Sequence, residues 1–334
     1  MKILFSSYHN PHFETITEYS ERAIQALGHD LVSFDDRAFV LPGRVRCAMP
    51  FLASWDLDRL NRMFVAAVKK TLPDLCIVTG GHRILPWAVD AAKKAGAKVV
   101  LWTIDPPLDF DPVSRHAVAY TKVFCGGSEA LELLAAHGIA SEFLPFAYDG
   151  SLQPATIEDA SEHARYGSDV CFVGSHYPNR ERFFEKLSDV DLGIWGPSWG
   201  KLAPTSPLRG KIRCVDGVQP EVWKKVLTAS KMTVVAHYHD GDLPCHQVSP
   251  KVYEAMACGC MVLCDRQKDA QTLFAEDETI VFYDDADDAR AKIAQYLSHD
   301  ADRRRIADAA RRLVAEKHTY VRRMEQLLRS VYGT

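Results

Sequence analysis

Residues 249–263 read SPKVYEAMACGCMVL, and this stretch decides the fold class of the chain. Ser249 is a favourable N-cap and Pro250 suits the first helical position, so the pattern predicts a helix that begins there. Gly259 predicts the tight turn that ends this helix. The apolar residues that follow predict a buried strand, and a helix that leads directly into such a strand is typical of α/β proteins.

The start of this helix is a candidate anion site. The first N–H groups of a helix have no partner within it, and the helix dipole is positive at that end, so phosphate binds there readily. Glu254 lies about one turn further on, too far from the N-cap for a capping box, which leaves its carboxylate able to accept hydrogen bonds from ligand hydroxyls. Together these features indicate a nucleotide diphosphate. The same local pattern also occurs as a purely structural helix start in α/β proteins.

Short β-rich runs alternate with amphipathic helical patterns in both halves of the chain. The runs are residues 2–6, 31–34, 75–79, 98–103, 122–125, 142–144, 169–173, 192–195, 232–236, 261–264 and 279–282. Such alternation predicts parallel, doubly wound sheets. The pattern fades in the polar residues 149–168, where we expect the connection between two domains.

Length and composition agree with two domains and weigh against a nucleic-acid partner. A chain of 334 residues, 47% of them apolar, is long for one domain and sufficient for two cores. The net charge of −4 argues against a nucleic-acid partner. The cysteines are odd in number and include no Cys-x-x-Cys pair, which favours a reduced, cytoplasmic compartment. We expect no signal peptide and no membrane span, because no apolar stretch is long enough.

Several motifs carry a resemblance to a known family. Residues 249–259 resemble the Pro-x-x-(x)-Glu-Ala-Met-Ala-Cys-Gly signature of group 1 glycosyltransferases of the GT-B fold, and most of all their CgeB-like branch. Other segments resemble the same branch in family order: VCFVGS at 170–175 with Arg180, IWGPSW at 194–199, WTIDPP at 102–107, and HTY at 318–320 with Arg323. The resemblance spans most of the chain.

The resemblance implies an α/β GT-B fold. In it, two Rossmann-like doubly wound parallel-sheet domains face each other across a cleft, and the last helix crosses back to the first domain. We therefore expect an acceptor-side domain at residues 1–160 and a nucleotide-sugar donor domain at 161–318. Residues 319–334 would form the helix that packs on the first domain.

The resemblance also implies which residues contact the donor. Glu254 would hold the ribose, the start of the helix would bind the diphosphate, and residue 215 lies in the loop that meets the base. The residues expected at the donor are Gly174, Ser175, Arg180, Val215, Ser249, Lys251, Tyr253 and Glu254. Taken without the resemblance, residues 174–180 favour a plain strand-to-helix turn with a surface arginine, and residues 215–218 are merely a turn.

Catalytic candidates on the acceptor side are Asp105, His9 and His12. Asp105 follows a strand and precedes two prolines, which should fix its carboxylate at the strand end, where it could act as a general base, bind the acceptor or stabilise a turn. His246 marks a departure from the family pattern, because many retaining members carry Glu at this position. The contact to the donor sugar and the stereochemical outcome therefore stay open.

We expect no metal and no cofactor. Residues 237–246 contain His, Asp and Cys, which leaves a metal as an alternative, but their spacing matches no structural zinc pattern and they fall where the family carries its donor-sugar loop. The expected activity is metal-independent transfer of a sugar from a nucleotide diphosphate to an unknown hydroxyl acceptor, whether glycan, small molecule or protein. Two alternatives stay open: a catalytically silent nucleotide-sugar-binding protein, or an epimerase or hydrolase on the same frame.

Overall fold

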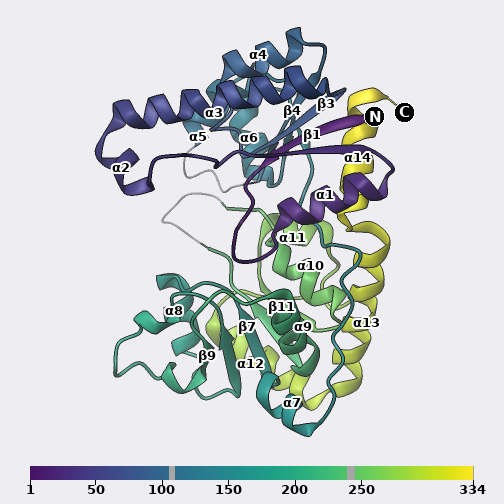
Figure 1. Cartoon of the computed structure of the whole chain (residues 1–334). Helices are drawn as coiled ribbons and strands as arrows, with labels where there is room; N and C mark the ends of the chain where they lie inside the picture. Colours follow the sequence, from purple (N-terminus) through teal and green to yellow (C-terminus); the bar gives the residue numbers. More distant parts are fainter. Residues whose placement is uncertain (105–109, 239–244, 334) are drawn as a thin grey trace. The chain divides into compact units, whose positions relative to one another are not determined.

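The computed structural model describes residues 1–104, 110–238 and 245–333. These residues form two compact units (Figure 1). Unit 1 comprises Met1–Asn10, Thr15–Pro145 and Arg323–Thr334, and unit 2 comprises Pro11–Glu14 and Phe146–Arg322. Residues 146–160, which we expected to complete the first domain, thus belong to unit 2.

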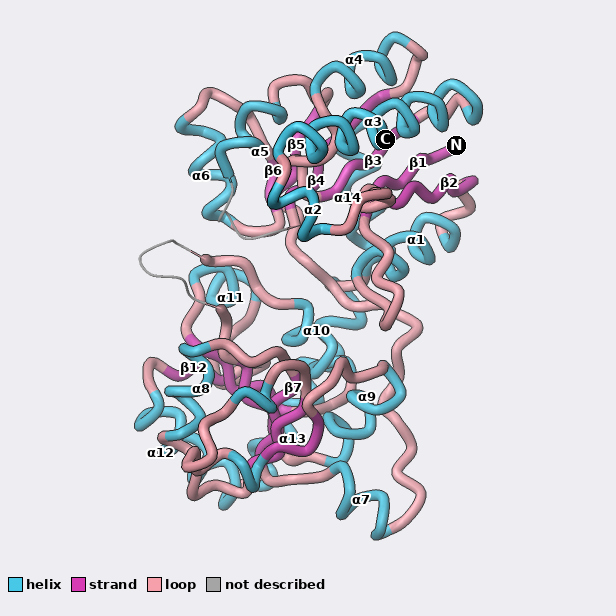
Figure 2. Tube along the Cα trace, turned by 60° about the vertical axis from the view of Figure 1, so that its left-hand side comes forward, coloured by secondary structure: helices cyan, strands magenta, loops and turns pink. Residues whose placement is uncertain are grey.

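Each unit is built on one sheet of six parallel strands, drawn in magenta in Figure 2. In unit 1 the strand order is β2-β1-β3-β4-β5-β6, and in unit 2 it is β12-β11-β10-β7-β8-β9. The strands of unit 1 are β1 (Lys2–Ser7), β2 (Asp30–Asp35), β3 (Leu75–Thr79), β4 (Lys98–Thr103), β5 (Lys122–Cys125) and β6 (Glu142–Phe143). Those of unit 2 are β7 (Val170–Val173), β8 (Leu192–Trp195), β9 (Ile212–Cys214), β10 (Met232–Val235), β11 (Met261–Asp265) and β12 (Val281–Tyr283).

The prediction of two parallel, doubly wound sheets is confirmed. Every run expected as a strand forms one, with ends that differ by at most two residues. The sequence pattern missed β9, a strand of three residues at the edge of the second sheet that pairs with β8 across a bulge. Its residues are half-buried or exposed, so it lacks the apolar run that identifies a central strand.

Helices flank both sheets (Figure 1). In unit 1 they are α1 (Ile16–Ala26), α2 (Gly43–Ala48), α3 (Pro50–Thr71), α4 (Pro86–Lys94), α5 (Phe110–Ala117) and α6 (Ser128–Ala136). In unit 2 they are α7 (Ala160–Tyr166), α8 (Pro178–Glu185), α9 (Pro220–Ala229), α10 (Pro250–Ala257), α11 (Lys268–Leu273), α12 (Ala286–Ser298) and α13 (Asp300–Lys317). None of the helices in the described residues is both long enough and apolar enough to cross a membrane.

The last helix, α14 (Tyr320–Tyr332), begins in unit 2 and belongs to unit 1 from Arg323 onward. Within unit 1 its last turns pack at the amino ends of β4 and β5. Lys98 and Lys122, which begin β4 and β5, donate from Nζ to the carbonyls of Val331 and Ser330 at 2.9 and 3.0 Å. Nearer its start, α14 contacts the end of β6, where Gln326 Nε2 donates to the carbonyl of Phe143 at 3.3 Å and Arg323 Nε donates to that of Pro145 at 2.8 Å.

Candidate functional site

The candidate site of unit 2 lies where the strand order of its sheet reverses. β7 and β10 are neighbours at the centre of the sheet, and the chain proceeds outward from them in opposite directions, to β8 and β9 on one side and to β11 and β12 on the other. Open α/β sheets bind ligands at the carboxyl ends of the strands where the order reverses, so the loops after β7 and β10 are the expected ligand site of this unit. Gly174 and Ser175 follow β7, and Ala236 and His237 follow β10.

Two glycines allow the loops after β7 and β8 to touch. Gly196 has φ +143°, and a Cβ there would lie 2.3 Å from the carbonyl oxygen of Gly174. The indole N–H of Trp199 donates to that same oxygen at 2.8 Å. A Cβ at Gly174 would lie 3.4 Å from Cε of Lys251. The bare backbone of the β7 turn thus lets the lysine side chain lie against it.

The start of α10 agrees with the sequence prediction. Ser249 is the N-cap, Pro250 is the first helical residue, and the Ser249 hydroxyl accepts from the backbone N–H of Lys251 at 3.4 Å. This distance is at the long limit for a hydrogen bond, so the cap satisfies that N–H only weakly. The N–H of Ser249 itself donates to Nε2 of His237 at 2.9 Å, which joins the beginning of the helix to the end of β10.

His237 is held from its other side by Asp265, the last residue of β11. Its Nδ1 lies 2.6 Å from Oδ1 of Asp265, and its backbone N–H donates to Oδ2 at 3.1 Å. Because Nε2 accepts from Ser249, the ring proton resides on Nδ1 and the imidazole is neutral. The sequence pattern missed Asp265. The signal for it is its position at the carboxyl end of a strand next to β10.

Lys251 and Glu254 lie one turn apart on α10, and both are half-buried. Burial raises the pKa of the Glu254 carboxyl, and Lys251 opposes that shift. Burial lowers the pKa of the Lys251 ammonium, and Arg180 adds to this effect while Glu254 opposes it. Within the described residues, neither side chain forms a hydrogen bond or an ion pair. Two half-buried charges that form no hydrogen bond or ion pair with the described residues are suited to a ligand that carries both negative charge and hydroxyl groups.

The structure shows how the Arg180 side chain is held. Its side chain is buried and donates from Nε to the carbonyl of Ala236 at 2.8 Å and from Nη1 to that of Ser175 at 2.9 Å. It also lies over the ring of Tyr177 at 4.9 Å. Arg180 is therefore not a surface arginine; it ties the loop after β7 to the loop after β10. Its side chain does not reach into solvent, but its buried charge contributes a positive potential at this end of the sheet.

Tyr253 and Val215, both expected at the donor, differ in their burial. The side chain of Tyr253 is fully buried, with its ring 5.5 Å from Phe274 and 5.6 Å from His318. Only its backbone is available at the start of α10. Val215 is 46% exposed, and its carbonyl accepts the N–H of Ser198 at 3.2 Å. The loop expected to meet the base is thus tied to the loop after β8.

Of the catalytic candidates, His9 lies in unit 1, and His12 and His246 lie in unit 2. Nε2 of His9 lies 3.0 Å from both Glu21 Oε1 and Ser33 Oγ, so this ring is engaged within unit 1. His12, expected on the acceptor side, belongs to unit 2, where its carbonyl accepts from Gln219 Nε2. His246 is half-buried in the loop before α10. Asp105 lies outside the described residues.

The histidine-rich segment is described only in part, because residues 239–244 lie outside the described residues. Within the described part of the chain, donor atoms of His237, Cys264 and Asp265 all lie within 4.8 Å of one another. Both ring nitrogens of His237 are already hydrogen-bonded, to Asp265 and to Ser249. In this arrangement the trio serves to hold the helix start.

Comparison with family models gives one assignment. Residues 180–329 match the family model described as "Glycosyl transferase-like". The matched segment contains α8 and α10, and with them Arg180, Lys251 and Glu254. A comparison with curated proteins gives no match.

Solved structures resemble the whole chain in fold. HepE from Anabaena, solved in complex with UDP and glucose, superposes with a TM-score of 0.70 at 13% identity over 100% of each chain. The sucrose-phosphate synthase from Thermosynechococcus elongatus gives a TM-score of 0.72 at 13% identity over 99% of each chain. A putative UDP-N-acetylglucosamine 2-epimerase from Listeria monocytogenes gives 0.60 at 11% identity over 99% of this chain and 97% of that chain. At these identities the likeness establishes the GT-B fold and leaves the reaction open.

Proposed function

We propose that the protein is a glycosyltransferase that moves a sugar from a nucleotide diphosphate to a hydroxyl group of an acceptor. The match of residues 180–329 to the "Glycosyl transferase-like" family supports this activity. The likeness in fold to HepE, which was solved with UDP and glucose, makes UDP-glucose the first donor to test. The CgeB-like branch and a cytoplasmic location are our finer proposals, and they rest on the motifs and composition of the chain.

The observation that carries the proposal is the Glu254 carboxylate. It is half-buried one turn into α10, it has no hydrogen-bonding partner among the described residues, and burial raises its pKa. A carboxylate in this state gains free energy when hydroxyl groups donate to it, by about 1.5 to 3 kcal/mol for a charged hydrogen bond. The vicinal hydroxyls of a ribose are such donors, so we assign Glu254 to the ribose.

The diphosphate would then lie at the start of α10. The positive end of the helix dipole, the Lys251 N–H, which Ser249 caps only weakly, and the Lys251 ammonium all stabilise negative charge there. During transfer the bond between the sugar and the diphosphate oxygen breaks, and charge builds on the diphosphate as the acceptor oxygen bonds to the sugar. Groups already placed at that charge stabilise the transition state without reorganisation, and on this ground we propose transfer that does not depend on a metal.

Two residues complete the proposed mechanism. His246 precedes α10 and would contact the donor sugar or a phosphate, in the place where many relatives carry Glu. Asp105 would take the proton of the acceptor hydroxyl as that hydroxyl attacks. His9 and His12 are weaker candidates, because a ring nitrogen of the first is already hydrogen-bonded and the second belongs to unit 2.

Incubation with UDP-glucose and other nucleotide sugars, with and without a panel of acceptors, tests this function. A transferase releases nucleotide faster when an acceptor is present, and it forms a glycosylated product. Tight binding without any turnover would instead identify a silent binding protein. The presence of His246 in place of the Glu of many relatives favours this alternative. Conversion of the nucleotide sugar without an acceptor would identify an epimerase or hydrolase, a possibility that the likeness to the Listeria structure keeps open.

A further inference from the structure

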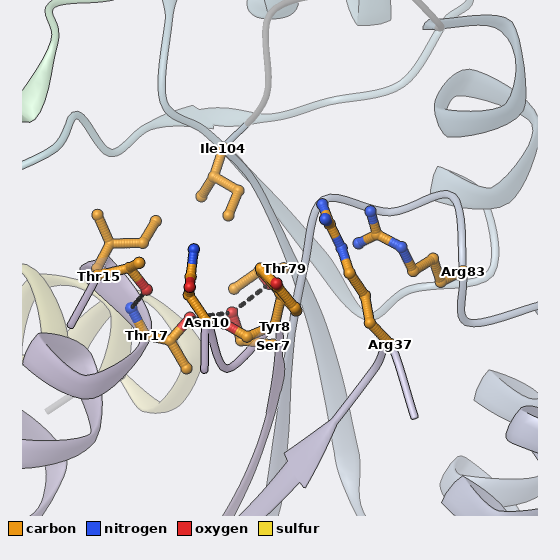
Figure 3. Close-up of a pocket in the computed structure, with 10 residues that line it drawn as sticks. Ser7, Tyr8, Asn10, Thr15, Thr17, Arg37, Thr79, Arg83 and Ile104 are labelled. Atoms are coloured by element: carbon orange, nitrogen blue, oxygen red, sulfur yellow. Dashed lines mark hydrogen bonds between the residues drawn. The ribbon is translucent and has the colours of Figure 1, made fainter. Parts of the chain in front are cut away.

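Unit 1 contains a cavity of about 240 Å³ at the carboxyl ends of its central strands (Figure 3). β1 and β3 are the neighbours from which the order of this sheet reverses, and Ser7 and Thr79, their last residues, both line the cavity. The cavity therefore occupies the switch point of unit 1, the position that corresponds to the α10 site in unit 2. Its volume suits a small molecule rather than a length of polymer.

Hydroxyl groups that already bond to one another form part of the cavity wall. Thr79 Oγ1 donates to Ser7 Oγ at 2.9 Å, Ser7 Oγ lies 2.8 Å from Thr17 Oγ1, and Thr17 Oγ1 donates to the carbonyl of Tyr8 at 2.7 Å. All three side chains are buried. These hydroxyl groups donate to one another and to the Tyr8 carbonyl. The wall they form is therefore polar and rigid but supplies no charge.

The charge of the cavity comes from Arg37 and Arg83, whose guanidinium groups both reach the side away from Thr15 and Thr17 in Figure 3. Among the described residues that line the cavity, these two are the charged ones, and none is acidic. The Arg37 guanidinium lies over the Tyr8 ring at 4.1 Å and forms no hydrogen bond or ion pair within the described residues. Stacking fixes the plane of the guanidinium and leaves its edge, which carries the N–H groups, able to donate.

Arg83 is oriented from behind the cavity. Its Nη1 lies 3.4 Å from both carboxylate oxygens of Asp36, which is fully buried. These distances exceed those of strong charged hydrogen bonds, so Asp36 positions the arginine without binding it tightly. Both arginines oppose the rise in the pKa of Asp36 that its burial causes, so both act on the charge of this carboxylate.

The start of α1 does not compete for an anion. Its N-cap, Thr15, takes part in a capping box: the hydroxyl of Thr15 accepts from the helix, and Glu18 Oε2 accepts from the backbone N–H of Thr15 at 2.6 Å. These N–H groups are satisfied within the helix, and Glu18 adds a negative charge there. The cationic recognition in this cavity therefore belongs to the two arginines.

We propose that the unit 1 cavity binds the acceptor and that this acceptor is a small hydroxylated molecule bearing a phosphate or carboxylate group. Two guanidinium groups beside a polar wall match an anion with adjacent hydroxyls, because arginine binds both anions through paired N–H groups. This inference rests on the proposed function, which requires an acceptor in addition to the donor assigned to unit 2.

Calorimetry on the full chain tests the inference with three probes: glucose 6-phosphate, glucuronate and glucose. The variants are Arg37→Gln and Arg83→Gln, and Arg44→Gln serves as the matched control because Arg44 is exposed on α2 and does not line the cavity. UDP is titrated into every variant as an independent measure of the unit 2 site.

We expect the two acids to bind and glucose to bind far more weakly. Arg37→Gln should weaken the better acid about 10- to 100-fold, the loss of a charged hydrogen bond, while Arg44→Gln should change it less than twofold. UDP affinity should stay the same in all variants, and the acid that binds more tightly identifies the anion. Arg37 is exposed, so its variant keeps the test valid even if Arg83→Gln fails to fold.

Binding of neither acid, equal binding of glucose, or an unchanged affinity in Arg37→Gln would overturn the inference. Acids that bind while UDP does not would leave the anion site standing and remove the proposed function. UDP binding without acid binding would remove the anion site and leave the proposed function standing.

Discussion

His237 donates from Nδ1 to the carboxylate of Asp265 over 2.6 Å, and this bond determines how α10 begins. With its proton on Nδ1, the ring must accept at Nε2, and it accepts the backbone N–H of Ser249. The end of β11 thereby sets the position of the helix start that we assign to the diphosphate.

Asp265→Asn tests this arrangement. The carboxylate accepts from N–H donors of the backbone and ring of His237 and of Gln267, and from the Cys264 thiol at 3.6 Å. An amide nitrogen cannot accept from any of them, so one bond is lost. We expect the free energy of unfolding to fall by about 1 to 3 kcal/mol and UDP affinity to fall several-fold. Asp284→Asn, which removes an exposed carboxylate near the same strand edge, is the control, and equal effects in both variants would remove Asp265 from this role.

Gly196→Ala should destabilise unit 2. A Cβ at this position would lie 2.3 Å from the carbonyl oxygen of Gly174, and the φ of +143° is unfavourable for any other residue. We expect a loss of about 1 to 3 kcal/mol in the free energy of unfolding, visible as a lower Tm. Gly210→Ala is the matched control, because a Cβ there meets nothing within 4 Å. A Gly196→Ala protein as stable as the control would contradict the described contact.

Asp36 should make stability depend on pH. Burial is the main cause that raises its pKa from 3.8 to about 6, and Arg83 opposes the shift. A raised pKa in the folded state means that the folded protein binds the proton more tightly than the unfolded chain does. The contribution to stability is therefore fully present below about pH 4 and is lost as the pH rises through 6, by roughly 2 to 3 kcal/mol in total.

Denaturant titrations between pH 4 and pH 8 check this dependence. The difference in free energy of unfolding between the wild type and Asp36→Asn should move in favour of the wild type as the pH falls from 7 to 4. The same substitution at exposed Asp90 controls for the loss of one charge. A difference that stays flat across this range, or that moves the other way, would show that Asp36 is not the titrating group.

The local chemistry of the sequence was sufficient for the sheets and for the start of α10. Ser249 and Pro250 specify a helix start through their own side chains, and the central strands have continuous apolar runs. The partners of Arg180 were not predictable in this way. They are backbone carbonyls at the ends of two strands, and the arginine reaches Ala236 across 56 positions of sequence.

The other features that the sequence did not predict also depend on contacts between distant parts of the chain. His237 and Asp265 meet because β10 and β11 are neighbours, and strand order is not encoded in either residue. Tyr253 was expected at the ligand because of its place in the motif, but it lies on the face of α10 that packs on Phe274. The cavity of unit 1 combines residues from the ends of β1 and β3, the loop after β2 and the start of α1, and no single motif marks it.

Chelation should leave transfer intact. The proposed mechanism neutralises the diphosphate with the α10 start and Lys251, so it assigns no step to a metal. We expect the rate of nucleotide release in the presence of an acceptor to be the same, within twofold, before and after treatment with EDTA. A loss of turnover that zinc, magnesium or manganese restores would contradict this mechanism and would direct attention to His237, Cys264 and Asp265.

The titration of UDP into Glu254→Gln is the most direct test of the central claim, that a half-buried carboxylate on α10 binds the nucleotide. The substitution keeps the shape of the side chain and removes its charge, and because burial disfavours that charge we expect Tm to stay level or to rise. UDP affinity should fall by about 1.5 to 3 kcal/mol, which is roughly 10- to 150-fold, while the matched substitution at exposed Glu278 should leave it unchanged. A folded Glu254→Gln protein that binds UDP as tightly as the wild type would contradict the account.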